Sequence, residues 1–247
     1  MDRRQFLAHS SILLMGSSFL GCLSNNRPTL KSDQIIGCLG DSITYGNKEG
    51  YVELLQQYYA KNHPEMNLTF RNWGKSSETI TGLTEEHHPG PRPYLFERLD
   101  TLMDSEPVDV ITFCYGINCG IYGPPSQALF DSYKTGIYTF LEKIKQRNIR
   151  AILLTPPPLV LDVAPISPAA QETSYGYLNP YPDYDKEVLQ EFKEIVLDFN
   201  HRAVMDIIDI NTPLFKNRAD CYDTDPIHPN AQGHRLIADM IIENFGI

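Results

Sequence analysis

Residues of the types used in acyl transfer occur at separate places in the 247-residue sequence. Ser42 lies in "GCLGDSITYG", where an apolar stretch runs into a polar turn. Asp225 and His228 lie three residues apart in "DTDPIHPNAQGH", which two prolines stiffen. This spacing lets the carboxylate accept the imidazole Nδ1–H, so that Nε2 faces outward as a base. A serine nucleophile needs such a base and a group that fixes the base's tautomer.

Donors for a developing oxyanion occur in two further segments. Gly74 in "NWGKSSET" allows the backbone to approach a ligand because no side chain intervenes. Asn118 in "YGINCG" offers a side-chain amide, and the Ser42 amide is the third donor. Asp41 is expected to support the nucleophile turn through hydrogen bonds. Each segment alone fits an ordinary turn or helix cap, but the complete set favours an acyl-transfer site.

The elements between these segments predict an α/β domain. Runs rich in β-branched and aromatic residues predict five strands, at residues 34–39, 68–73, 108–115, 151–155 and 205–210. Helical spacing predicts helices at residues 50–62, 93–104, 128–148, 185–204 and 230–245. This alternation predicts a parallel sheet covered on both faces. Ligands bind beyond the carboxyl ends of such strands, where the chemistry-bearing segments fall.

One connection, residues 156–185, is much longer than the usual two to six residues. It contains seven prolines and four tyrosines, and it starts where the fourth strand ends. Two interpretations remain open. The segment is either an ordered surface insertion or a wall over the site that selects the substrate, and its position favours the wall.

The segments around Ser42, Gly74, Asn118 and His228 resemble the sequence blocks of the SGNH hydrolase superfamily, also called GDSL esterases and lipases. The resemblance extends from the first strand to the last helix. It implies a three-layer α/β/α sandwich with a flavodoxin-like, five-stranded parallel sheet and a site without metal or cofactor. It also implies a triad of Ser42, His228 and Asp225, with an oxyanion hole formed by the Ser42 and Gly74 amides and Asn118. The sequence has no Gly-x-Ser-x-Gly elbow, which argues against an α/β-hydrolase fold.

The third block departs from the family pattern. Members often have an aspartate after the asparagine, whereas this chain has Cys119 there. One hypothesis is that a disulfide from Cys119 to Cys221 braces the loop instead. Cys38 and Cys114 lie in apolar runs and are expected to be buried free thiols.

The N-terminal residues 1–21 have the sequence features of a signal peptide and resemble a twin-arginine export signal. They end in a stretch that resembles a lipobox, whose cysteine would be Cys22, although an ordinary cleaved signal is the alternative. Residues 22–33 then form a tether, and residues 34–247 form the hydrolase domain. The protein is expected to be exported to the periplasm or cell envelope and to be lipid-anchored at Cys22.

These features predict a serine esterase acting on short-chain O-acetyl esters of carbohydrate, such as an acetylated polysaccharide. The alternatives are a lipase or lysophospholipase, an O-acyltransferase, and a catalytically inactive carbohydrate-binding module. The net charge of −10 does not favour nucleic acid or an anionic membrane surface as a partner. The run Glu85-Glu86-His87-His88 is expected to be an exposed polar loop rather than a metal site.

Overall fold

The computed structural model describes residues 29–46, 49–166 and 174–245. The expected signal peptide and lipobox lie outside the described residues, as do most of the tether and residues 167–173 of the long connection. Five strands form one parallel sheet in the order β2-β1-β3-β4-β5. Their bounds are Ile35–Gly40 (β1), Thr69–Gly74 (β2), Val110–Cys114 (β3), Arg150–Leu154 (β4) and Val204–Ile208 (β5). The predicted five-stranded parallel sheet is confirmed.

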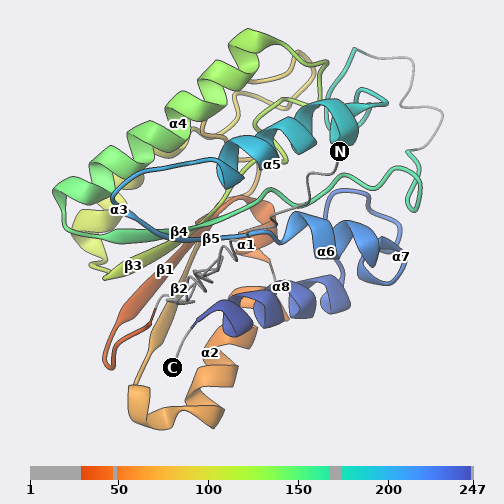
Figure 1. Cartoon of the computed structure of the whole chain (residues 1–247). Helices are drawn as coiled ribbons and strands as arrows, with labels where there is room; N and C mark the ends of the chain where they lie inside the picture. The colour runs from red at the N-terminus through yellow and green to blue at the C-terminus, as the bar shows by residue number, and fades with distance from the viewer. Residues whose placement is uncertain (1–28, 47–48, 167–173, 246–247) are drawn as a thin grey trace, which may run out of the picture.

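Helices cover both faces of the sheet (Figure 1). One face carries α3 (Leu99–Ser105), α4 (Gln127–Gln146) and α5 (Gln190–Leu197). The other carries α2 (Tyr51–Asn62), α6 (Asn211–Lys216), α7 (Arg218–Cys221) and α8 (Ala231–Asn244), while the short α1 (Ser42–Tyr45) directly follows β1. The fold is therefore the expected three-layer α/β/α sandwich. None of the helices in the described ranges is both long and apolar enough to cross a membrane.

The strand order reverses at β1, because β2 lies on one side of it and β3, β4 and β5 follow on the other. The register aligns the ends of β1, β2 and β3 there. Gly40 pairs with Gly74 of β2 on one side and with Cys114 of β3 on the other. Chain segments that leave a parallel sheet at such a switch point diverge and open a crevice. The segments that follow β1, β2 and β3 therefore start side by side.

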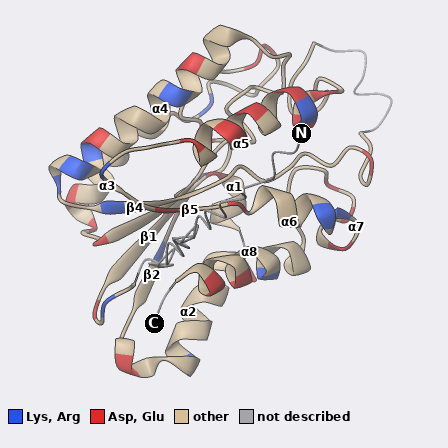
Figure 2. Cartoon of the chain, in the orientation of Figure 1, with Lys and Arg blue, Asp and Glu red and all other residues tan. Residues whose placement is uncertain are grey.

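The core is built from the strands and the inner faces of the helices. All five residues of β3 are buried, and the Phe113 ring stacks on Phe140 of α4 with centroids 4.2 Å apart. Burial of a large apolar side chain stabilises the fold by about 1.5–3 kcal/mol. Charged residues of both signs lie along α3 and α4 (Figure 2), where Lys143 forms an ion pair with Asp100. Because this pair is partly exposed to solvent, it contributes only about 0–1 kcal/mol.

The helices depart from the prediction in several places. The helix predicted to end at residue 204 ends at Leu197, because Ala203 and Val204 already pair with Ala151 of β4. The two helices α6 and α7 were not predicted, since they have only six and four residues and show no helical period.

The four cysteines in the described ranges are free and buried. The prediction for Cys38 and Cys114 is confirmed, but the hypothesis of a Cys119–Cys221 disulfide is wrong. The two residues have different neighbours: the Cys119 carbonyl accepts a hydrogen bond from Thr81, whereas the Cys221 carbonyl accepts one from the Asn230 amide.

Replacing Gly74 by alanine should destabilise the fold. The added Cβ would lie 2.0 Å from the amide nitrogen of Tyr45 and 2.4 Å from its Cα, which are backbone atoms of α1. Such overpacking typically costs about 1–3 kcal/mol. Thermal denaturation should show a lower Tm for Gly74→Ala than for the control Gly123→Ala, where the nearest atom to an added Cβ is 3.7 Å away. Equal Tm values for the two variants would contradict this packing.

Candidate active site

Ser42, His228 and Asp225 form one hydrogen-bonded chain at the carboxyl edge of the sheet. Ser42 Oγ lies 2.8 Å from His228 Nε2, and His228 Nδ1 lies 2.7 Å from Asp225 Oδ2. The fold thus brings together side chains that are 186 residues apart in the sequence. The order nucleophile, base and orienting carboxylate is the one that acyl transfer requires.

The loop that carries Asp225 and His228 is held by its own backbone. Asp225 Oδ1 accepts hydrogen bonds from the amides of Ile227 at 2.8 Å and His228 at 3.2 Å. Asn230 then caps α8, with its side-chain oxygen accepting from the amides of Gln232 and Gly233. These contacts fix the carboxylate and the imidazole before a substrate arrives.

The contact between Asp225 and His228 shifts the pKa of each side chain in the direction that favours its charged form. The hydrogen bond to Asp225 raises the pKa of His228 above 6.5, although partial burial opposes this. Partial burial raises the pKa of Asp225, but its hydrogen bonds with His228 and Ile227 outweigh that effect and leave it below 3.8. Asp225 thus stays ionised and stabilises the imidazolium form of His228.

The nucleophile turn begins with the buried Asp41. This residue caps α1, and its Oδ1 accepts a hydrogen bond of 3.0 Å from the Ile43 amide. Burial raises the pKa of Asp41 to about 7. Ser42 is the first residue of α1, so its amide N–H has no intrahelical partner. Asp41 thus holds the first turn of α1 by a hydrogen bond, and its support of a nucleophile stays a prediction.

The two other predicted oxyanion donors differ in their availability. Asn118 Nδ2 is buried without a hydrogen-bond partner among the described residues. The amide of Gly74 instead donates to Asn72 Oδ1 at 3.0 Å. In this conformation the Asn118 amide is therefore not engaged by another group in the described ranges, whereas the Gly74 amide is.

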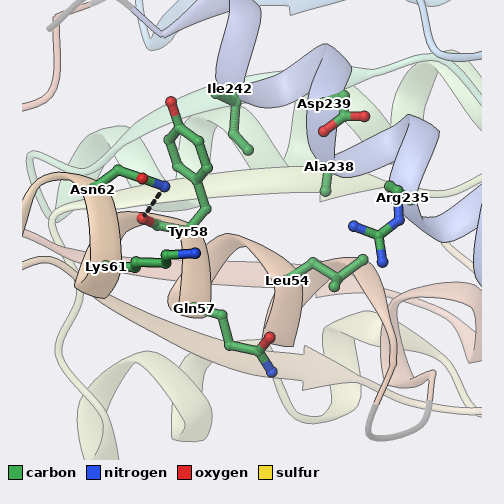
Figure 3. A pocket seen from close by; sticks show the side chains of 9 residues that line it. All are labelled: Leu54, Gln57, Tyr58, Lys61, Asn62, Arg235, Ala238, Asp239 and Ile242. Carbon is green, nitrogen blue, oxygen red and sulfur yellow. Dashed lines mark hydrogen bonds between the residues drawn. The ribbon is translucent and has the colours of Figure 1, made fainter.

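A pocket of about 350 Å³ opens beside His228. Asn118 and His228 line it together with Tyr177, which comes from the long connection after β4. Its other lining residues are Ser77, His88, Pro89, Arg92, Tyr122 and Ile227. A second hollow lies between α2 and α8 (Figure 3), and none of the predicted site residues lines it. The pocket beside His228 is thus the one that the catalytic constellation can use.

Sequence reasoning missed the residues behind Asn118. The expectation of an exposed loop is wrong for Glu85, which is buried and forms an ion pair with Arg92. Tyr184 also braces the Asn118 loop: its hydroxyl donates to the Ile117 carbonyl at 3.0 Å and accepts from the Gly120 amide at 3.1 Å. The only signal in the sequence was the missing aspartate at Cys119, which implied that another group must brace this loop. Across the described ranges, no group of three or more His, Cys, Asp or Glu side chains is placed to hold a metal ion.

Comparison of the sequence with protein families gives one match. The sequence pattern of the GDSL-like lipase/acylhydrolase family matches residues 38–236, which include all of the predicted site residues. No curated protein sequence matches this chain at a significant level.

Solved structures with the same fold include enzymes of several kinds. An α/β hydrolase enzyme from the metagenome of Lake Arreo has 19% identity and a TM-score of 0.61, covering 87% of this chain and 96% of that chain. An acetylxylan esterase from Geobacillus stearothermophilus has 16% identity and a TM-score of 0.60, covering 89% and 97%. A gut microbial diltiazem-metabolizing enzyme has 18% identity and a TM-score of 0.59, covering 88% and 48%. These similarities show a shared fold.

The His228 pKa should depend on its partner carboxylate. Because the hydrogen bond to Asp225 is the largest cause that raises this pKa, Asp225→Asn should move the imidazole titration to lower pH. NMR titration of the His228 ring measures the shift. Asp239→Asn, an exposed change on α8, is the control and should leave the midpoint in place. An unchanged midpoint in Asp225→Asn would contradict the ion pair.

Proposed function

Because the chain belongs to the GDSL-like lipase/acylhydrolase family and is a carboxylic ester hydrolase, we propose that it is a serine esterase acting on short-chain O-acetyl esters of carbohydrate. The observation that carries the proposal is the continuous hydrogen-bonded chain from Ser42 Oγ through His228 to Asp225. A catalytically inactive binding module would not need this geometry.

The reaction proceeds through an acyl-enzyme. His228 Nε2 takes the proton of Ser42 as Oγ attacks the ester carbonyl carbon, and Asp225 holds the resulting imidazolium. The oxyanion accepts hydrogen bonds from Asn118 Nδ2 and the Ser42 amide. Gly74 adds a third donor only if its amide leaves Asn72 Oδ1. The alkoxide leaves with the proton of His228, and a water molecule activated by the same base then releases the acid.

The pocket favours a small acyl group on a polar leaving group. Its lining combines polar groups of Ser77, Arg92 and Asn118 with the aromatic side chains of Tyr122 and Tyr177. Aromatic faces beside hydrogen-bonding groups suit a sugar ring, whereas a lipase requires a long apolar groove. The structural similarity to an acetylxylan esterase supports the same substrate class by analogy. An O-acyltransferase would use the same triad with a sugar hydroxyl in place of water.

The proposed cellular location follows from the N-terminal sequence. The signal-like residues 1–21 and the lipobox-like stretch before Cys22 support export and a lipid anchor. Acetylated polysaccharides of the cell envelope would then be within reach of the site.

Replacing Ser42 should abolish turnover without unfolding the protein. Ser42→Ala removes the attacking oxygen from a partly buried position at the start of α1. The rate of 4-nitrophenyl acetate hydrolysis should fall about 10³-fold or more, while the Tm stays close to that of the wild type. Wild-type turnover by the folded variant would reject Ser42 as the nucleophile.

Acyl-chain length should separate the esterase from a lipase. With 4-nitrophenyl esters from acetate to decanoate, kcat/KM should be highest for acetate and fall with each longer chain, because a pocket of about 350 Å³ that also holds part of the leaving group has little room for a long acyl chain. Acetate release from acetylated xylan, measured in parallel, tests the carbohydrate. Activity confined to long chains would overturn the proposed substrate.

A further inference from the structure

Behind Asn118 lies a buried ion pair between Arg92 and Glu85. Arg92 Nη2 lies 2.5 Å from Glu85 Oε1, and Arg92 Nε lies 2.5 Å from Glu85 Oε2. The side chains of Arg92 and Glu85 are only 1% and 2% exposed. The cost of removing such a pair from water offsets most of the attraction between its charges, so the pair contributes little net stability to the fold. A role in orienting Asn118 would explain its presence.

The arginine reaches Asn118 with its remaining nitrogen. Arg92 Nη1 donates to Asn118 Oδ1 at 3.0 Å and also to the Ser77 carbonyl at 3.2 Å. The Tyr122 hydroxyl donates to the same Asn118 Oδ1 at 3.0 Å. Both lone pairs of this amide oxygen are therefore used.

These contacts determine which way the Asn118 amide points. A guanidinium group has no acceptor, so the Asn118 NH₂ group cannot face Arg92. The oxygen is therefore held against Arg92 and Tyr122, and Nδ2 faces away from them as an unpartnered buried donor. Donation from a cation to the amide oxygen also polarises the N–H bonds on the other side of the amide.

The loop that carries Asn118 has an unusual backbone conformation at Ile121 and Tyr122. Ile121 and Tyr122 have φ angles of 48° and 56°, a left-handed conformation that is unfavourable for a β-branched residue such as isoleucine. Residues of the long connection contact both Glu85 and Tyr122. The Tyr177 amide lies 3.4 Å from Glu85 Oε1, and the Tyr184 ring stacks on Tyr122 with centroids 5.2 Å apart.

We propose that Arg92, held by Glu85, is a positioning residue that locks the Asn118 amide with its N–H groups toward the oxyanion. Tyr122 is the second part of this lock. The contacts of Arg92 and Tyr122 with Asn118 take the place of the brace that an aspartate at position 119 would provide. The proposal rests on the proposed function, because the lock has a kinetic effect only if Asn118 stabilises the transition state of ester hydrolysis.

A double-mutant cycle on 4-nitrophenyl acetate hydrolysis tests this role. The variants are Arg92→Gln, Asn118→Ala and their combination, each with kcat, KM and Tm measured. Arg92→Gln should lower kcat about 10- to 100-fold with KM nearly unchanged, because a misplaced donor weakens the transition state. In the Asn118→Ala background the same change should lower kcat less than about 3-fold, because the donor is already gone.

Two further variants keep the test valid if Arg92→Gln does not fold. Glu85→Gln combined with Arg92→Gln removes both charges of the pair and leaves no lone buried charge. Tyr122→Phe leaves the ion pair intact and removes one bond to Asn118 Oδ1. It should lower kcat about 2- to 10-fold, and this loss should vanish in the Asn118→Ala background.

A second ion pair, in which Glu78 is buried and Arg98 is partly exposed, supplies the control. Arg98 and Glu78 form a bidentate ion pair at 2.7 Å, and Arg98 also donates to the Trp73 carbonyl at 2.8 Å, with no bond to Asn118. Replacing both by glutamine should change kcat by the same factor with and without Asn118, whatever its effect on Tm.

The outcomes separate this inference from the proposed function. A wild-type protein without esterase activity would reject both. An active wild type in which Arg92→Gln and Tyr122→Phe cause equal losses with and without Asn118 would reject only the positioning role. Losses that disappear in the Asn118→Ala background would establish it.

Discussion

The pairing of Gly40 with Gly74 on one side and Cys114 on the other is the constraint on which the site depends. It places the ends of β1, β2 and β3 at one level, where the strand order switches. Gly40 and Gly74 leave room for α1 to pack directly over the sheet, since an added Cβ on either would collide with Thr44 or Tyr45. Strand pairing thus places Ser42 at the same edge of the sheet as the Asn118 loop.

Polar contacts then fix the side chains on this frame. The segment between β2 and α3 is anchored by two ion pairs, Glu85 with Arg92 and Glu78 with Arg98. Tyr115, just beyond β3, adds a hydrogen bond to Glu78. Buried charges are tolerated in a fold only when each is paired and hydrogen-bonded, and these pairs meet both conditions. The result is a buried Asn118 amide whose orientation is set in advance by Arg92 and Tyr122.

Much of this arrangement could be predicted from the sequence. The apolar runs predicted every strand end to within two residues, because a buried parallel strand needs a continuous apolar segment. The types and order of Ser42, Asn118, Asp225 and His228 predicted that these residues would share one edge. The geometry agrees for Ser42, Asp225 and His228, which are linked by hydrogen bonds. The Asn118 side chain lines the pocket beside them.

The rest depends on contacts that no local pattern encodes. Glu85 lies in a run of charged residues that has the composition of an exposed loop, and its burial follows only from Arg92 seven positions later. The bond between the Gly74 amide and Asn72 depends on a side-chain rotamer, which spacing does not determine. The contribution of Tyr184 requires the long connection to fold back onto the Asn118 loop.

The central claim is that Ser42 is the nucleophile that the whole edge of the sheet is built to activate. Peptide mass spectrometry after reaction with a fluorophosphonate tests this most directly, because such reagents react preferentially with a serine activated by a neighbouring base. We expect a single phosphonyl adduct on Ser42 and a parallel loss of ester hydrolysis. An adduct on another residue, or full hydrolysis with Ser42 completely modified, would contradict it.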